Sequence, residues 1–563
     1  MKRFLVLLKF AACSSLAFAQ WSTDPAQNLQ VLRNCIKPRI ATDGDGGVII
    51  VGESFTQNPV LQAQRVDKYG AILWDPSLRG IRVATMSDEQ AEAIVLSDGE
   101  GGAYLSFQAK TIVGYDPVLR ETIYSSPVRV QRIDAQGNLL FGPEGVMIHE
   151  NPDNVVTGQD NYALVLGDSG GIYTLVGAPR GLQGRNAYVN YVAPNGQLPW
   201  ESSLALHPAT DWIKKNFLAY PDGEGGLIIY YTPFNSSYSD RFIRINKRRE
   251  IIIDKPIETG LTPFYLFAAE QGEGILFWQD FNQLMQLDII RCQKIERNGE
   301  KIWGENPVII DSTGLIANVR LVGIASDHAG GAFVAYGIKK LKSLIVHMNN
   351  QGRITLKEIV SNFNAEAFSE QECMILINHR GILYSTFVWQ EFGHAYALDS
   401  LGNEIWPKVT YSTRQQDNSF DAMISDSNGG AIFAWHEILP SRGIWTQQVN
   451  SSGQLGIVTG VKNPSDQKSL PQNFELLPAY PNPFRAAVRI AYQLNKPQEV
   501  FLKVYDLAGK EVIALVKQRQ APGLHEVIWN GRDKHGRLAS SGVYFYQLST
   551  ESQQQMRKLV FLR

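Results

Sequence analysis

The feature that most constrains this fold is a glycine-rich turn that returns eight times along the chain. In each copy a short apolar run enters a polar turn that closes on glycine, and a second apolar run follows, as in ATDGDGGVIIV at 41–51. The closing glycines recur at intervals of 48 to 69 residues, and they are Gly47, Gly102, Gly171, Gly226, Gly274, Gly331, Gly381 and Gly430. Self-similarity at this spacing is typical of a repeat architecture.

A second turn follows the first in each copy, as in RVDKYGAILW at 65–74. Asp or Asn opens it and glycine closes it, which is the chemistry of a hairpin turn that needs a positive φ. Copy four departs from the pattern, with Arg249 in the glycine position. Four places after the glycine lies an apolar position, here called the slot, which we expect in the core; its residues are Trp74, Phe141, Trp200, Ile253, Trp303, Leu356, Trp406 and Ile457.

Two turns and the apolar runs around them predict four short antiparallel strands per copy. Four-stranded units of about 50 residues, repeated radially, describe a β-propeller. The predicted fold class is therefore all-β, with an eight-bladed propeller (alternatively seven-bladed) over residues 20–460. Residues 21–34 resemble the fourth strand of a copy but precede the first copy, so we expect them to complete or cover the last blade.

The string LGDSGGI at 166–172 matches the nucleophile region of trypsin-like proteases. Ser169 nevertheless occupies the first turn of copy three, and His149 is the only upstream histidine, just 20 residues away. A trypsin-like triad needs a distant histidine and an aspartate between the two, so Ser169 is predicted to be a turn residue. The chain also lacks the common zinc-protease, hydrolase and nucleotide-binding motifs, so no catalytic residue is predicted.

The sequence predicts no cofactor and no metal. The cysteines after the leader, Cys35, Cys292 and Cys373, form no CxxC pair and are expected to be buried free thiols. Acid pairs such as Asp43 and Asp45 are too few for a calcium loop. The formal net charge of -2 gives no reason to expect nucleic acid as a partner.

The first nineteen residues have the pattern of a secretory signal peptide. A basic start and an apolar run, MKRFLVLLK, precede Ala17-Phe18-Ala19, which predicts cleavage between Ala19 and Gln20. Lipid attachment at Cys13 is the less favoured alternative, because Phe10 stands where an aliphatic residue is usual. No later apolar run reaches the ~20 residues of a transmembrane helix, so no transmembrane segment is expected.

The repeats stop after Gly460, and residues 461–475 read as a polar linker. Residues 476–563 then alternate short apolar runs with turns such as Asp506–Gly509 and Asn530-Gly531. Six or seven short strands in about ninety residues predict a small β-sandwich of immunoglobulin type.

This C-terminal segment resembles the type A sorting domain of the Bacteroidetes type IX secretion system, also called the Por secretion tail, which is similar to the Ig-like domain of the flagellar hook cap. Asn530 stands where that family usually has Asp. The matching motif residues are Tyr480, Pro481, Asn482, Pro483, Phe484, Asp506, Gly509, Gly523, Trp529, Gly531, Asp533, Gly536, Ser541, Gly542, Tyr544, Lys558 and Arg563.

The resemblance implies a route and a partner. The signal peptide would take the chain into the periplasm, and the type IX machinery would then move it across the outer membrane. The protein would be secreted or left at the cell surface, and the tail is usually removed. The resemblance implies nothing about what the exported part does.

A candidate ligand face is expected where the second strands of three copies end. Aromatic residues stand two positions before acids there, and the six residues are Trp278, Asp280, Trp389, Glu391, Trp435 and Glu437. An aromatic ring beside a carboxylate suits sugar binding, and paired carboxylates could hydrolyse a glycoside. The favoured function is noncatalytic binding or adhesion to a glycan or protein, and the alternative is a polysaccharide hydrolase or lyase. Copy two carries about twelve extra residues within 109–127, where binding loops are also expected.

Overall fold

The structure is a computed structural model. It describes residues 21–86, 89–116, 121–125, 127–148, 160–167, 170–179, 185–206, 213–233, 240–257, 263–268, 272–282, 287–313, 319–327, 329–338, 342–360, 374–377, 382–389, 392–399, 403–414, 422–426, 428–438, 442–456, 474–476, 479, 484, 487–494, 497–506, 510–520, 523–550 and 554–561. The predicted signal peptide and its cleavage site at Ala19 and Gln20 lie outside the described residues, and so does Ser169.

The chain divides into two compact units, Met1–Val458 and Thr459–Arg563. Small antiparallel β-sheets make up both units, and the described ranges contain no α-helix. The predicted all-β class is therefore confirmed.

The first unit contains eight small sheets among its described residues, and their strands follow one another in chain order except at the last sheet. The first four sheets are formed by β2 (Cys35–Thr42), β3 (Val48–Ser54), β4 (Leu61–Val66) and β5 (Ile81–Arg82); β6 (Glu89–Ser97), β7 (Ala103–Asp116), β9 (Val128–Ile133) and β10 (Val146–Met147); β11 (Asp160–Leu166), β12 (Ile172–Pro179), β13 (Arg185–Val192) and β14 (Leu204–Ala205); and β15 (Ile213–Pro221), β16 (Leu227–Pro233), β17 (Asp240–Ile245) and β18 (Ile251–Ile257).

The remaining four sheets follow the same plan, except that the last one takes a strand from the start of the chain. They are formed by β19 (Pro263–Ala268), β20 (Gly274–Asn282), β21 (Leu287–Ile295) and β22 (Val308–Thr313); β23 (Val319–Ser326), β24 (Ala332–Ile338), β25 (Lys342–Met348) and β26 (Ile354–Val360); β27 (Met374–Ile377), β28 (Leu383–Trp389), β29 (Phe392–Leu398) and β30 (Glu404–Ser412); and β31 (Ala422–Ser425), β32 (Ala431–Glu437), β33 (Gly443–Val449) and β1 (Leu29–Arg33).

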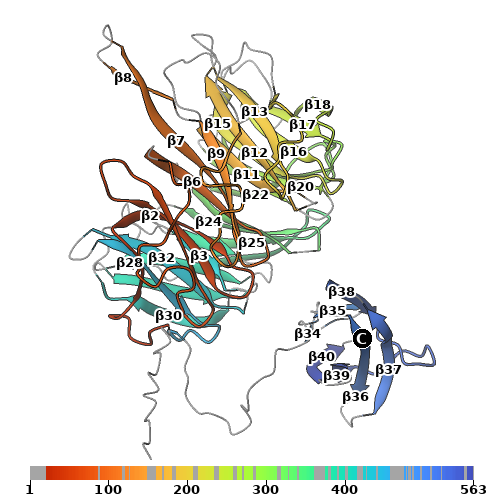
Figure 1. The fold of residues 1–563 in the computed structure, drawn as a ribbon. Coiled ribbons are helices and arrows are strands. Elements are labelled where there is room, and N and C mark those ends of the chain that lie inside the picture. The colour runs from red at the N-terminus through yellow and green to blue at the C-terminus, as the bar shows by residue number, and fades with distance from the viewer. Residues whose placement is uncertain are drawn as a thin grey trace, which may run out of the picture. The chain divides into compact units, whose positions relative to one another are not determined.

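Neighbouring sheets contact each other through their first strands. Strand β2 contacts β6, and the series continues through β11, β15, β19, β23, β27 and β31, which contacts β2 again. Figure 1 shows the strands of the first sheet beside those of the last, although the two sheets are about 400 residues apart in the chain. Between the sheets lie apolar clusters such as Ile49, Val51, Ala103 and Leu105.

The extra residues of copy two lengthen one hairpin. Strand β7 is 14 residues long, and its far half pairs only with β8 (Glu121–Ser125). In Figure 1 this hairpin extends beyond the neighbouring strands.

Aspartate shapes the first turn of five copies. In copy one, Asp43 Oδ1 accepts the N–H groups of Asp45 and Gly47 at 2.9 and 2.8 Å. Asp98, Asp222, Asp327 and Asp426 make the same pair of bonds. A Cβ on Gly47 would lie 2.4 Å from the Val66 carbonyl oxygen, which explains why glycine ends the turn.

The second carboxylate oxygen of each of these aspartates faces a polar residue on the third strand of its own sheet. Asp43 pairs with Arg65 at 3.0 Å, and Asp327 Oδ2 lies 3.0 Å from His347 Nε2. The equivalent pairs are Asp98 with Arg132, Asp222 with Arg244, and Asp426 with Gln448. Each pair links the first turn to the second, because its partner lies two residues before the second turn begins.

The pairing of Asp327 predicts a pH-dependent contribution to stability. Burial opposes ionisation, but the His347 hydrogen bond and two backbone N–H groups outweigh it and lower the pKa of this carboxyl. A lowered native pKa stabilises the fold above the unfolded value of ~4, and the contribution is lost as the pH falls through the native pKa. Asp327→Asn should therefore cost about 1–3 kcal/mol at pH 7, and the difference from wild type should shrink towards pH 3.

Urea unfolding of the full chain across this pH range measures the effect. Asp45→Asn is the matched control, because the Asp45 side chain is 73% exposed and pairs only with a surface lysine. A penalty for Asp327→Asn that stays constant down to pH 3 would contradict the assignment.

The seam between the last and first sheets is closed by the start of the chain. Strand β1 pairs antiparallel with β33, with Leu29 opposite Thr446 and Leu32 opposite Ile444. This pairing confirms the prediction that residues 21–34 complete the last repeat.

The slot residues connect one copy to the next. Trp74 Nε1 donates to the Ala135 carbonyl at 3.0 Å, and Trp303 Nε1 donates to the Asn350 carbonyl at 2.9 Å, each acceptor lying in the second turn of the following copy. Trp21 Nε1 makes the equivalent bond to the Lys68 carbonyl of copy one at 3.0 Å. Trp21 thus makes the contacts of a slot residue for copy eight, to which the sequence pattern assigned Ile457, a residue outside the described ranges.

The second unit has two small antiparallel sheets around one core. The first sheet has β34 (Phe474–Leu476), β35 (Val488–Leu494) and β38 (Gly523–Trp529); the second has β36 (Gln498–Asp506), β37 (Glu511–Gln520), β39 (Gly542–Ser549) and β40 (Gln554–Phe561). Buried residues from both sheets form a single cluster that includes Val488, Trp529, Tyr546 and Phe561.

Candidate functional site

The pair Trp435 and Glu437 at the end of β32 is buried. The two side chains are 0% and 1% exposed, and Trp435 Nε1 donates to Glu437 Oε1 at 3.3 Å. The Glu437 carboxylate also accepts two bonds from Arg414, at 2.7 and 2.9 Å. The Arg414 guanidinium in turn lies 3.6 Å from the centre of the Trp445 ring.

This arrangement describes a buried ion pair that closes against two tryptophans. A carboxylate held by both nitrogens of a guanidinium fork is oriented and charge-balanced, and a ring that stacks on a sugar needs an exposed face. Glu437 and Trp435 therefore have partners within the protein that account for their burial.

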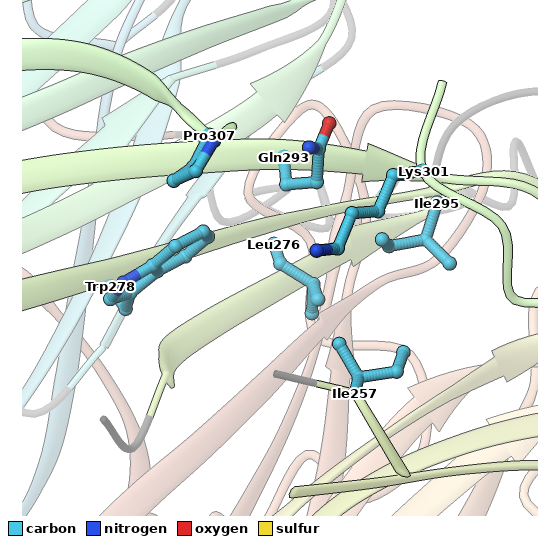
Figure 2. A pocket seen from close by; sticks show the side chains of 7 residues that line it. All are labelled: Ile257, Leu276, Trp278, Gln293, Ile295, Lys301 and Pro307. Carbon is cyan, nitrogen blue, oxygen red and sulfur yellow. The ribbon is translucent and has the colours of Figure 1, made fainter. Parts of the chain in front are cut away.

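Trp278 at the end of β20 lines a small hollow between the fourth and fifth sheets. The side chain is 2% exposed, and it shares the hollow with Ile257, Leu276, Gln293, Ile295, Lys301 and Pro307. Figure 2 shows the indole ring and Leu276 on one side and the Lys301 side chain reaching over the hollow. The cavity volume of about 10 Å³ is what one water molecule needs, so a sugar ring does not fit.

The other predicted ligand-face residues are described only in part. Asp280 lies in β20 opposite Ile289, and Trp389 lies in β28 opposite Phe392. Glu391 lies outside the described residues. The three aromatic–acid pairs belong to three different sheets, and the described residues do not bring the pairs together.

A polar cluster that the sequence interpretation missed lies at the far end of β2 and β3 from the glycine turn. Glu53 Oε2 accepts Lys37 Nζ at 2.7 Å, and Glu53 Oε1 accepts the backbone N–H of Glu92 at 3.2 Å. Gln108 Nε2 donates to Glu92 Oε2 at 2.9 Å. Because Lys37 and Glu53 belong to the first sheet and Glu92 and Gln108 to the second, the cluster bridges two neighbouring sheets.

Two residues of this cluster have an unusual backbone. Lys37 and Glu92 have φ values of 51° and 52°, each at a bulge in the first strand of its sheet. The left-handed conformation costs a residue with a side chain about 1–2 kcal/mol, and such strain gathers at functional sites. The Lys37 side chain is 56% exposed, so its ammonium group is available to a polar ligand.

The repeat register carries the signal that could have identified this cluster. Lys37 and Glu92 each stand ten residues before the closing glycine of their copy, Gly47 or Gly102. Glu53 and Gln108 each stand six residues after it. Comparing polar residues at equal register, rather than aromatic–acid pairs, would have selected these positions.

Several motif residues of the predicted sorting domain build the core of the second unit. Phe484 stacks on Phe561 at 4.8 Å between ring centres, and Trp529 packs edge-on against Tyr544 at 5.3 Å. Trp529 Nε1 donates to the Arg532 carbonyl at 2.8 Å. These rings join residues from both ends of the unit, so the aromatic motifs hold the two sheets together.

The polar motif residues shape turns. Asp533 Oδ1 accepts the N–H groups of His535 and Arg537, and Asp506 Oδ1 accepts that of Lys510. Gly531 and Gly536 have φ values of 69° and 78°, Gly523 and Gly542 begin β38 and β39, Lys558 lies in β40, and Ser541 directly precedes β39. The motif residues Tyr480, Pro481, Asn482, Pro483, Gly509 and Arg563 lie outside the described residues.

The described residues contain no helical segment that could serve as a membrane span. Within the same ranges, no three His, Cys, Asp or Glu side chains gather as a metal site would require.

Comparison with known families identifies one match, to the FlgD Ig-like domain, over residues 484–554. The resemblance of the C-terminal segment to an Ig-like domain of the flagellar hook-cap type is therefore confirmed at this coarser level. No match is found among curated protein sequences.

Solved structures with a similar arrangement are remote. A eukaryotic initiation factor aligns with 10% identity over 77% of this chain and 89% of its own, at a TM-score of 0.39. Prolyl oligopeptidase B of Galerina marginata aligns with 12% identity over 75% and 56%, at 0.40. PorZ of Porphyromonas gingivalis, a bacterial surface component of the type-IX secretion system, aligns with 11% identity over 92% and 79%, at 0.28. Likenesses at this level carry no information about function.

Proposed function

We propose that this protein is exported by the type IX secretion system and binds material at the cell surface without catalysing a reaction. In this proposal residues 1–19 are a signal peptide, residues 20–460 form an eight-bladed β-propeller, and residues 461–475 are a linker. Residues 476–563 are the sorting domain, and the mature protein is secreted or held at the outer surface after passing through the periplasm.

The observation that carries the export proposal is the second unit itself. It is compact, it matches the FlgD Ig-like family, and its motif residues Phe484, Trp529 and Tyr544 lie together in its core. A separate unit with its own core can fold by itself, which is what a transferable export signal requires.

The propeller proposal is supported by the order of contacts in the first unit. Each first strand contacts the first strand of the next sheet, and the eighth contacts the first. Strand β1, from the start of the chain, supplies the outer strand of the eighth sheet.

Binding is proposed for the end of the sheets opposite the glycine turns. The cluster of Lys37, Glu53 and Glu92 lies there and offers one exposed ammonium group beside carboxylates held in strained backbone. Groups of both charges, fixed in place, suit a polar ligand such as a glycan or a protein surface.

A binding screen of the full chain against immobilised polysaccharides and cell-envelope proteins tests this function, with release of reducing sugar measured alongside. Lys37→Met should weaken binding about tenfold, because a charged hydrogen bond contributes about 1.5–3 kcal/mol. Lys68→Met is the matched control, since Lys68 pairs with Asp45 at the opposite end of the sheet. Release of reducing sugar, or equal binding by the two variants, would contradict the proposal.

A further inference from the structure

The segment Trp21–Arg33 lies across three sheets of the first unit. At the seventh sheet, Asn28 Nδ2 donates to the Tyr411 carbonyl and Asn28 Oδ1 accepts the Ser412 hydroxyl, both at 2.8 Å. At the eighth sheet β1 pairs with β33. At the first sheet the backbone N–H of Trp21 donates to the Tyr69 carbonyl.

These contacts are buried and specific, although the segment is the first part of the described chain. Trp21, Asn28 and Leu32 are all at most 6% exposed. Gln447 Nε2 donates to the Ser22 carbonyl at 3.1 Å, across 425 positions of sequence. The segment is therefore a plug for a seam whose other residues are made last.

A single residue connects this plug to the first sheet. Asn34 stands between β1, which ends at Arg33, and β2, which begins at Cys35, and its φ is 55°. Its N–H donates to the Arg442 carbonyl at 3.0 Å and its carbonyl accepts the Phe55 N–H at 2.7 Å. A one-residue link held in a left-handed conformation is a short hinge under strain, and such hinges favour exchange of the attached segment between copies.

We propose that the seam is a strand-acceptor site that a second copy of this chain can fill. In the exchanged dimer, Trp21–Arg33 of each copy occupies the seam of the other, and Asn34 is extended so that β1 and β2 run on as one strand. The interface is the one already present between β1 and β33, so every hydrogen bond of the seam is retained. Because the segment lies ahead of the first sheet, it can leave and enter a seam without threading through the fold.

The synthesis order of the chain favours the exchange. Strand β1 emerges first, and its partner β33 follows about 400 residues later. Until then β1 is unpaired, and an unpaired strand edge is a template for another chain. A copy whose seam is complete but still empty is therefore an acceptor for the plug of its neighbour.

The hinge residue provides the first test. Asn34→Val should raise the fraction of dimer in the refolded full chain about tenfold, because a β-branched residue resists the left-handed conformation, and Asn34→Gly should lower it. Arg249→Val is the matched control, since Arg249 has a φ of 70° but lies in a turn far from the seam. Light scattering coupled to size exclusion reads the dimer fraction, and equal dimer in the three variants would overturn the proposal.

A cross-linking experiment identifies the exchanged strand directly and does not depend on the hinge variants. Leu29 and Thr446 are paired across the seam, so one chain carries Leu29→Cys and the other carries Thr446→Cys. Native Cys35 and Cys292 are buried, and burial raises the pKa of the Cys35 thiol to about 12, so these thiols stay unreactive near pH 8.

The two chains are unfolded, refolded together and oxidised. A disulfide-linked dimer on a non-reducing gel is the expected result, because only exchange brings the two cysteines together. A chain with both substitutions shows that the pair can form a disulfide within one copy. If this double variant cross-links internally and the mixed chains give no dimer, the proposal fails.

Discussion

Removal of residues 476–563 is expected to leave the first unit folded and to prevent it from reaching the cell surface. The eight sheets of the first unit have their own apolar clusters, and the chain divides at Val458 and Thr459. Folding of the first unit should therefore survive the truncation, whereas the proposed export signal is lost completely. The expected change is all-or-none: surface protein in the full chain, and periplasmic protein in the truncated one.

The measurement is cell fractionation with protease accessibility, in a strain with the type IX machinery and in one without it. Fusing residues 461–563 to an unrelated periplasmic protein should send that protein to the surface. Trp529→Ala in the fusion is a matched variant, because Trp529 is fully buried among Phe484, Tyr544 and Phe561, and it should abolish surface delivery by unfolding the unit. A truncated chain at the surface, or a fusion that stays in the periplasm, would make the second unit an ordinary accessory domain.

Replacing Trp21 with alanine is expected to lower the free energy of unfolding by about 3–5 kcal/mol, the usual cost of removing a fully buried tryptophan. The side chain is 2% exposed and packs with Val31, Leu32 and Ile432. The substitution also leaves the Lys68 carbonyl without the indole N–H. Because Trp21 holds the segment that closes the seam, the loss should be accompanied by faster proteolysis near residues 21–33.

Urea unfolding followed by circular dichroism measures this effect on the full chain. Trp21→Phe keeps an aromatic ring and loses only the hydrogen bond, so it should cost about 1 kcal/mol. Trp74→Ala is the matched control, since Trp74 makes the same type of bond between two internal copies and is partly exposed. Equal losses for Trp21→Ala and Trp74→Ala would show that closing the seam adds nothing to stability.

Local chemistry in the sequence was enough to predict the repeating unit. The aspartate of the first turn bonds to N–H groups two and four residues ahead, as Asp43 does, so the turn is encoded within five residues. The slot is apolar in every copy because it meets the next copy, and Phe141, Trp200 and Trp406 are buried as expected. The turns and strands of the second unit follow from the same local rules, which is why the Ig-like type could be read from its motifs.

The candidate site followed from the sequence much less well. An aromatic residue two places before an acid has the same spacing whether it faces solvent or the core, and Trp435 with Glu437 faces the core. What decides this is Arg414, which belongs to the preceding sheet region and is 23 residues away. The cluster of Lys37, Glu53 and Glu92 likewise depends on a contact between two sheets.

The sequence by itself thus determined the all-β class, the eightfold repeat of turns and the presence of a separate C-terminal unit, because each of these rests on bonds between residues close together in the chain. Only the tertiary structure decided which residue fills the slot of the last copy and which polar groups meet at the sheet ends. Trp21 takes that slot, although Lys68, which accepts its hydrogen bond, is 47 positions away and Gln447, which holds its neighbour Ser22, is 425 positions away. Contacts over such separations are set by how the sheets are arranged in space, and no local pattern in the chain records that arrangement.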